Sequence, residues 1–143
     1  MNEVNEYIIN ILRKNSAIVK GYFACPYVDS EYKIKAKEKG RIINPKFIIN
    51  NHEDIKPNIG MIEKATQSIG KTLEQCKIYM IGDRLSDVEM GLNAKGTGIL
   101  IASKKTIELG DYEKVKKLQE NSLNIYIAKD FLDAATFIKN RES

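Results

Sequence analysis

The chain has 143 residues, 43% of them hydrophobic, and a formal net charge of +4 at pH 7. A chain of this length can bury a sizeable core, so residues 1–143 are expected to form one domain. The modest positive charge does not predict nucleic-acid binding, and no apolar run is long enough to span a membrane. Two cysteines and a polar, acidic N-terminus without a signal sequence predict a reducing, cytoplasmic setting.

The first half of the chain predicts a helix, a strand and an insertion. Apolar residues recur at helical spacing over residues 3–14, and Ala17–Phe23 is typical of a strand that ends at a Cys-Pro pair, residues 25–26. Residues 27–55 are lysine-rich and are interpreted as an insertion, such as a hairpin or a mobile flap. Within it, Lys46–Asn50 is apolar enough for a short strand.

The second half alternates between strand and helix patterns. A helix with Pro57 at its first position is followed by a strand at Lys77–Ile81, a Gly-Asp turn and a second helix. The remaining elements are expected to be a strand at 99–102, a helix at 111–121, a strand at 124–128 and a helix at 131–138. This alternation predicts an α/β fold, a Rossmann-like parallel sheet with helices on both faces.

Two carboxylates follow the strand at 77–81. Asp83 and Asp87 lie four residues apart, at the turn and in the first helical turn, so both can point into the cleft above the carboxyl end of the strand. Such a pair suits Mg²⁺, which usually takes one or two protein carboxylates together with water and substrate phosphate. A purely structural alternative also fits these residues, because Asp83 can cap the helix and Asp87 can interact favourably with its N-terminal end.

The string GDRLSD at residues 82–87 resembles the fourth motif of haloacid dehalogenase-like (HAD-like) phosphatases. The Lys-Pro pair at 56–57, the Gly-Met pair at 60–61 and Gly91 match the branch that contains heptose bisphosphate phosphatase and histidinol phosphatase. The resemblance covers roughly residues 20–101. It implies a HAD-like fold and Mg²⁺-dependent hydrolysis of a small phosphorylated metabolite, such as a sugar phosphate, through an aspartyl-phosphate intermediate.

The resemblance also implies roles for individual residues. Asp83 would bind Mg²⁺ and Asp87 would support it. Lys56 would be the catalytic lysine that steadies the phosphate and the nucleophile, and Lys56 and Arg84 would bind substrate. This chain departs from the branch at Ile55, which stands where the branch carries an arginine.

The family's nucleophile is not recognisable in this sequence. Members of the superfamily use an aspartate in a DxD motif at the end of the first strand, and a Ser or Thr at the end of the second. The opening residues resemble the family segment on the C-terminal side of that second motif, so the chain is expected to be a truncated member without the DxD portion. Asp29 is the candidate replacement, although no DxD pattern surrounds it.

A missing nucleophile strand would leave unpaired strand edges in the family's sheet. We therefore expect a rearranged sheet, a homo-oligomer or a separate chain that completes the sheet. In the same branch, the insertion can hold zinc. The corresponding residues here are Cys25, Tyr27, His52 and Asp54, and because tyrosine is a poor zinc ligand, zinc is not expected.

Two other functions remain open. One is a catalytically inactive remnant or subunit, a binding module that keeps the HAD-like fold. The other is a receiver-like module that accepts phosphate from a partner. It fits less well, because Asp83 is the only aspartate at a strand end that could accept phosphate.

Overall fold

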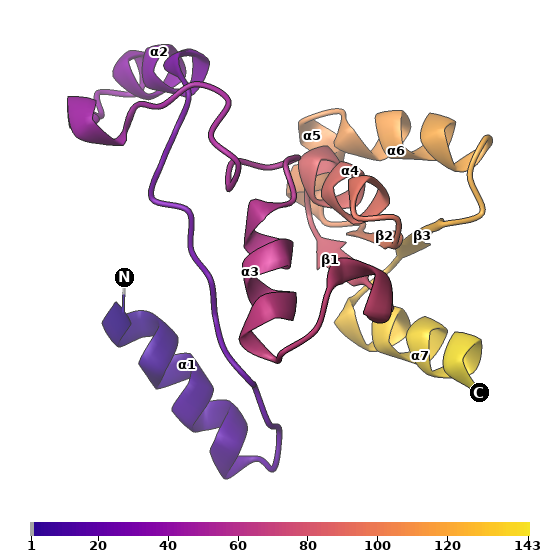
Figure 1. The fold of residues 1–143 in the computed structure, drawn as a ribbon. Coiled ribbons are helices and arrows are strands. Elements are labelled where there is room, and N and C mark those ends of the chain that lie inside the picture. Colours follow the sequence, from indigo (N-terminus) through magenta and orange to yellow (C-terminus); the bar gives the residue numbers. More distant parts are fainter. Residues whose placement is uncertain (1) are drawn as a thin grey trace.

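A three-stranded parallel sheet forms the centre of the computed structural model, which describes residues 2–143 (Figure 1). Its strands are β1 (Tyr79–Gly82), β2 (Thr97–Ile101) and β3 (Ile125–Ala128), in the order β1-β2-β3. All three carboxyl ends therefore lie at one edge of the sheet, as the α/β prediction requires.

Helices cover both faces of this sheet, as predicted. On one face, α4 (Leu85–Asn93) and α6 (Asp111–Gln119) pack on the strands, and the short α5 (Lys104–Glu108) leads into α6. On the other face lies α7 (Phe131–Glu142). Each face has its own buried apolar cluster: Val88, Leu100, Val115 and Ile125 on the α4–α6 side, and Ile99, Ala128 and Ala134 on the α7 side.

The N-terminal half packs less closely. It contains α1 (Asn2–Lys14), α2 (Ser30–Glu38) and α3 (Gly60–Ser68), with short 3₁₀ helices at Pro45–Phe47 and Leu73–Gln75. Figure 1 shows α3 beside β1, whereas α1 stands apart from the sheet at the end of a long extended segment. Four large apolar side chains of α1 remain exposed: Val4, Tyr7, Ile8 and Ile11.

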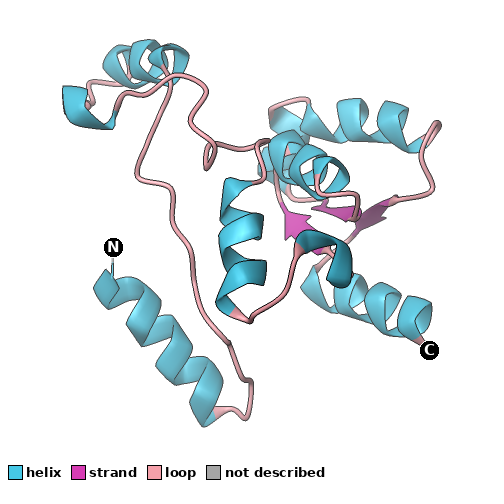
Figure 2. Cartoon of the chain, in the orientation of Figure 1, coloured by secondary structure: helices cyan, strands magenta, loops and turns pink. Residues whose placement is uncertain are grey.

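The predicted strand at Ala17–Phe23 is wrong. The segment is extended but belongs to no sheet, and Figure 2 shows strands only in the central sheet. β-branched and aromatic residues favour a strand only where a neighbouring strand completes the hydrogen bonding, and here none lies alongside.

Within the insertion at 27–55, the hairpin alternative and the expected strand are wrong, and no result here tests the mobile-flap alternative. The insertion forms a helix, α2, rather than a hairpin, and the expected strand at Lys46–Asn50 is replaced by the 3₁₀ helix and a single parallel bridge between Val28 and Ile48. Asp29 begins α2 as its cap, because its side chain accepts a hydrogen bond of 2.6 Å from the Tyr32 N–H.

Helix α3 begins at Gly60, three residues after the predicted position of Pro57. The intervening residues form a turn in which the Asn58 N–H donates to the Ile55 carbonyl at 2.9 Å. The Gly60 N–H donates to the carbonyl of Glu53 at 2.9 Å. This turn holds residues 56–58 outside the helix.

No helix within residues 2–143 is long and apolar enough to cross a membrane.

Replacing Gly98 with alanine is expected to destabilise the fold, because α4 lies directly against β2. A Cβ at Gly98 would lie 2.6 Å from the Val88 carbonyl oxygen and 2.7 Å from its Cγ1. Overpacking of this kind costs about 1–3 kcal/mol of unfolding free energy, measurable by urea denaturation. Gly21→Ala is the control, since a Cβ there would meet only the Phe23 ring, at 3.8 Å. Equal stability of the two variants would contradict the close approach.

Candidate functional site

The turn after β1 brings Asp87 back against the end of the strand. Asp87 is 3% exposed, and its Oδ2 accepts a hydrogen bond of 3.1 Å from the Arg84 N–H at the start of α4. A Cβ on Gly82 would collide with the Asp87 carboxyl group, so glycine is required there. The motif thus fixes a buried carboxylate at the carboxyl end of the sheet.

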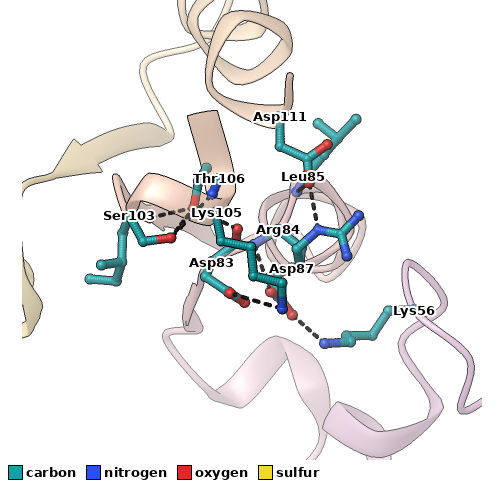
Figure 3. A network of polar contacts seen from close by, with 10 residues as sticks. Lys56, Asp83, Arg84, Leu85, Asp87, Ser103, Lys105, Thr106 and Asp111 are labelled. Atoms are coloured by element: carbon teal, nitrogen blue, oxygen red, sulfur yellow. Dashed lines mark hydrogen bonds and ion pairs between the residues drawn. The ribbon is translucent and has the colours of Figure 1, made fainter. Parts of the chain in front are cut away.

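Lys56 reaches the same carboxylate from a distant part of the chain. Its Nζ lies 2.6 Å from Oδ1 of Asp87, and the two residues are 31 positions apart in the sequence (Figure 3). The lysine side chain is 39% exposed. Asn93, at the end of α4, helps to hold this loop by donating to the Pro57 carbonyl at 3.1 Å. Lys56 therefore presents an ammonium beside a buried negative charge while remaining open to solvent.

Asp83 is the more accessible of the two motif carboxylates. Its side chain is 47% exposed, and Lys105 Nζ is 3.9 Å from its Oδ2. Figure 3 shows Asp83 and Lys105 together, next to the pair formed by Asp87 and Lys56. Unlike Asp87, whose two oxygens are both engaged, Asp83 has oxygen ligands available.

The Asp83 carboxylate oxygens are the groups at this site that could hold a magnesium ion. Among the residues that the structure describes, no group of three or more His, Cys, Asp or Glu side chains could hold a metal ion. Mg²⁺ usually needs only one or two protein carboxylates, because water and substrate phosphate complete its shell. The Asp83 carboxylate fits such a site, with Asp87 behind it.

A hollow of about 420 Å³ lies beside Lys56 and Arg84. The segment 25–35, including the start of α2, forms part of its lining, and residues 54–56, Met61 and Ser86 form the rest. The N-terminal part of the insertion therefore faces Lys56 and Arg84 across this hollow. Asp29, the candidate replacement nucleophile, lines this hollow, but its carboxylate caps α2.

The residues that correspond to a zinc site in related proteins lie near one another without forming a set of ligands. The Tyr27 ring lies over that of His52, with centroids 4.1 Å apart. Nδ1 of His52 accepts a hydrogen bond of 3.1 Å from the Asp54 N–H, and Cys25 Sγ donates to the Tyr27 carbonyl at 3.5 Å. Oδ2 of Asp54 is paired with Lys64 at 2.6 Å. The other carboxylate oxygen of Asp54, Oδ1, is buried and has no hydrogen-bond partner among the described residues.

The structure adds two site residues that sequence reasoning missed, Asp111 and Thr106. Asp111 Oδ2 accepts from Arg84 Nε at 2.6 Å and from the Leu85 N–H at 3.3 Å. Thr106 Oγ1 donates to the Asp83 carbonyl at 2.9 Å. Neither residue belongs to a recognisable motif, and no local signal in the sequence distinguishes them from surface residues.

The Asp111 carboxyl group predicts a pH dependence of stability. Burial raises its pKa, but the hydrogen bonds from Arg84 and the Leu85 N–H outweigh burial, so the pKa lies below its ordinary value of 3.8. A lowered pKa means that the carboxylate stabilises the fold above the ordinary pKa, and that this contribution is lost as the pH falls through the lowered value.

We therefore expect the difference in unfolding free energy between the wild type and Asp111→Asn to be constant at neutral pH and to shrink below about pH 4. Urea denaturation at a series of pH values from neutral to acidic measures this difference. A difference that stayed constant over the whole range would show that the carboxylate makes no such contribution.

Comparisons with known proteins show the family of the chain. A family model for HAD-hydrolase-like proteins matches residues 55–134. The D-glycero-alpha-D-manno-heptose-1,7-bisphosphate 7-phosphatase of Campylobacter jejuni is 30% identical over 132 residues, which cover 87% of this chain and 74% of that protein. No solved structure matches the chain significantly. The matched region includes Lys56 and the whole turn at 82–87, and the chain therefore belongs to the HAD-like hydrolases, as a relative of their phosphatases.

Proposed function

We propose that this chain carries the magnesium- and phosphate-binding half of a phosphomonoesterase site, and that its substrate is a small phosphorylated metabolite such as a sugar phosphate. The observation that carries the proposal is the meeting of Lys56 with Asp87, 2.6 Å apart, beside the exposed carboxylate of Asp83. The similarity to a heptose bisphosphate phosphatase supports a phosphorylated sugar as the substrate class.

Each residue has a distinct role in this proposal. Asp83 holds Mg²⁺, which when bound neutralises charge on the phosphate oxygens. Asp87 keeps the Lys56 ammonium in place, and Lys56 donates to the phosphate as charge develops on it. Arg84, which lines the hollow, binds the substrate phosphate. Because Ile55 replaces the arginine of related proteins, Arg84 and Lys56 carry this task without that third charge.

The nucleophile is proposed to come from a segment outside residues 1–143. In the family reaction, an aspartate oxygen attacks phosphorus, and the bond to the alcohol breaks as the alcohol takes a proton. Water then hydrolyses the acyl phosphate to the carboxylate and inorganic phosphate. In this proposal Asp83 is the metal ligand and Asp87 its support, and the sequence has no DxD motif to supply the attacking oxygen.

A free sheet edge next to the site supports this part of the proposal. On the side of β1 away from β2, no strand pairs with it among residues 2–143. A largely apolar groove of about 490 Å³ runs there, lined by residues 21–23, by α3 and by residues 76–80. Residues 21–23, which form the far wall, make no backbone–backbone hydrogen bond within the described chain. Both walls are therefore open to a partner strand.

The proposed occupant is an extended segment of another polypeptide, with an aspartate after its end. A strand added parallel to β1 would place its carboxyl end at the same edge of the sheet as Asp83, beside the site. Its backbone would satisfy hydrogen-bonding groups that are costly to leave unpaired when buried. A second copy of this chain is the alternative occupant, and the mass of the purified protein in solution distinguishes the two.

The test is hydrolysis of p-nitrophenyl phosphate by the purified chain with Mg²⁺, compared with Asp83→Ala. We expect no hydrolysis by either protein alone, because positioning and electrostatic groups remain without a nucleophile. Magnesium-dependent hydrolysis that is lost in Asp83→Ala would place the nucleophile within this chain and contradict the proposed partner. A stable monomer with no hydrolysis and no affinity for Mg²⁺ would favour an inactive remnant.

A further inference from the structure

Helices α5 and α6 hold the motif turn at three consecutive residues. Thr106 on α5 contacts Asp83, and Asp111 at the start of α6 contacts both Arg84 and Leu85 (Figure 3). Thr106 is fully buried and Asp111 is 4% exposed. Buried polar groups of this kind require partners, and each has a partner in the turn after β1, although Thr106 also contacts Ser103 and the Ile101 carbonyl.

The contact of Asp111 with Arg84 uses only one of the guanidinium's donors. Asp111 Oδ2 accepts from Nε, which is the nitrogen nearest the backbone. Within the part of the chain that the structure describes, the terminal nitrogens Nη1 and Nη2 have no hydrogen-bond partner in the protein. The Arg84 side chain is 43% exposed and lines the hollow next to Lys56. These two terminal nitrogens are therefore available to a ligand in the hollow.

The backbone places Asp111 for this contact. Gly110 has a φ of +72°, in the left-handed region, so the chain can reverse sharply between α5 and α6. Helix α6 then packs through Val115 against Val88 of α4, in the same buried cluster. Asp111 is also the first residue of α6, where the positive end of the helix favours a carboxylate. Its position is thus fixed by the core rather than by the site.

We propose that Asp111 is a positioning residue that fixes the guanidinium of Arg84, so that Nη1 and Nη2 donate together to two oxygens of a phosphate bound in the hollow beside Lys56. This inference rests on the proposed function of the same site. Arginine binds phosphate well because its planar fork donates two parallel hydrogen bonds. An arginine already held at Nε loses less side-chain freedom when the ligand binds.

The test measures the affinity of the full chain for inorganic phosphate by isothermal titration calorimetry, in a double-mutant cycle of Arg84→Met and Asp111→Asn. Arg84→Met is expected to weaken phosphate binding at least about tenfold, because it removes both charge-assisted hydrogen bonds, and Asp111→Asn about fivefold. In the Arg84→Met background, Asp111→Asn should have no further effect, because it acts only through the arginine. Asp130→Asn is the matched control, since Asp130 caps α7 and not the site.

Two further measurements do not depend on the Asp111 variant folding. Arg84→Lys keeps the positive charge but has no fork, and it should lose nearly as much phosphate affinity as Arg84→Met. In the wild-type protein, ¹⁵N NMR should show the Nε proton of Arg84 protected from exchange with water, because it is bound to Asp111.

Several results would overturn the inference. These are a wild-type chain that does not bind phosphate, an Asp111→Asn variant that binds it as well as the wild type, or a loss that persists in the Arg84→Met background. Wild-type affinity in Arg84→Lys, or a rapidly exchanging Nε proton, would do so as well. A separate measurement tests the proposed function. It would fail if the Mg²⁺ affinity of the chain were the same with and without the Asp83 carboxylate.

Discussion

Replacing Asp83 with asparagine is expected to weaken Mg²⁺ binding by about 100-fold, the upper end of the effects known for residues around metal sites. The reason is that Asp83 carries the only motif carboxylate with oxygens free to coordinate. Its side chain is 47% exposed and its cationic neighbour, Lys105, is 3.9 Å away. Mg²⁺ requires oxygen ligands, and a neutral amide supplies less negative charge than a carboxylate. Titration of Mg²⁺ followed by the backbone amide NMR signals of residues 82–87 measures the affinity.

The matched control removes one negative charge far from the site. Glu120→Gln at the end of α6 lies at the opposite end of that helix from Asp111 and should leave Mg²⁺ affinity unchanged. Equal affinity in Asp83→Asn and in the wild type would contradict the metal assignment. It would favour the structural interpretation, in which the motif serves to begin α4.

Replacing Leu100 with alanine is expected to lower the unfolding free energy by about 3 kcal/mol, within the range for a buried leucine. Leu100 is fully buried in β2, the middle strand, where it contacts the cluster that joins α4, α6 and β3. With only three strands in the sheet, neighbouring side chains can refill little of the space that the substitution leaves. Urea denaturation followed by circular dichroism gives the change.

Leu123→Ala provides the control for the leucine substitution. Leu123 is 93% exposed, so its replacement should change stability by less than about 0.5 kcal/mol. If Leu100→Ala changed the unfolding free energy as little as Leu123→Ala, that result would contradict the packing of β2 against α4 and α6. The Asp83 and Leu100 variants therefore test the site and its supporting sheet separately.

The regions where sequence-based prediction failed lie in the N-terminal half. Ala17–Phe23 has the composition of a strand, yet it stays unpaired, because strand formation depends on a neighbour that composition cannot supply. In the insertion, for which a hairpin was one of the two expectations, the helix α2 forms instead of a hairpin. There the Asp29 cap and the consecutive turns of the helix satisfy the backbone without any partner strand.

By itself, the sequence determined the strand, turn and helix around residues 77–93 and the parallel α/β class, both confirmed by the structure. These depend on apolar periodicity and on a turn whose residues are adjacent in the chain, so local rules are sufficient. The sequence also singled out Lys56, Asp83, Arg84 and Asp87, whose functional roles remain predictions.

Only the tertiary structure decided what surrounds those four residues. Asp111 is 27 positions from Arg84, and Thr106 is 23 positions from Asp83. They meet the motif because α6 packs on α4 through a shared apolar core, with the short α5 leading into it. Such a meeting depends on which helix faces which, a property of burial across the whole domain rather than of any one stretch of sequence.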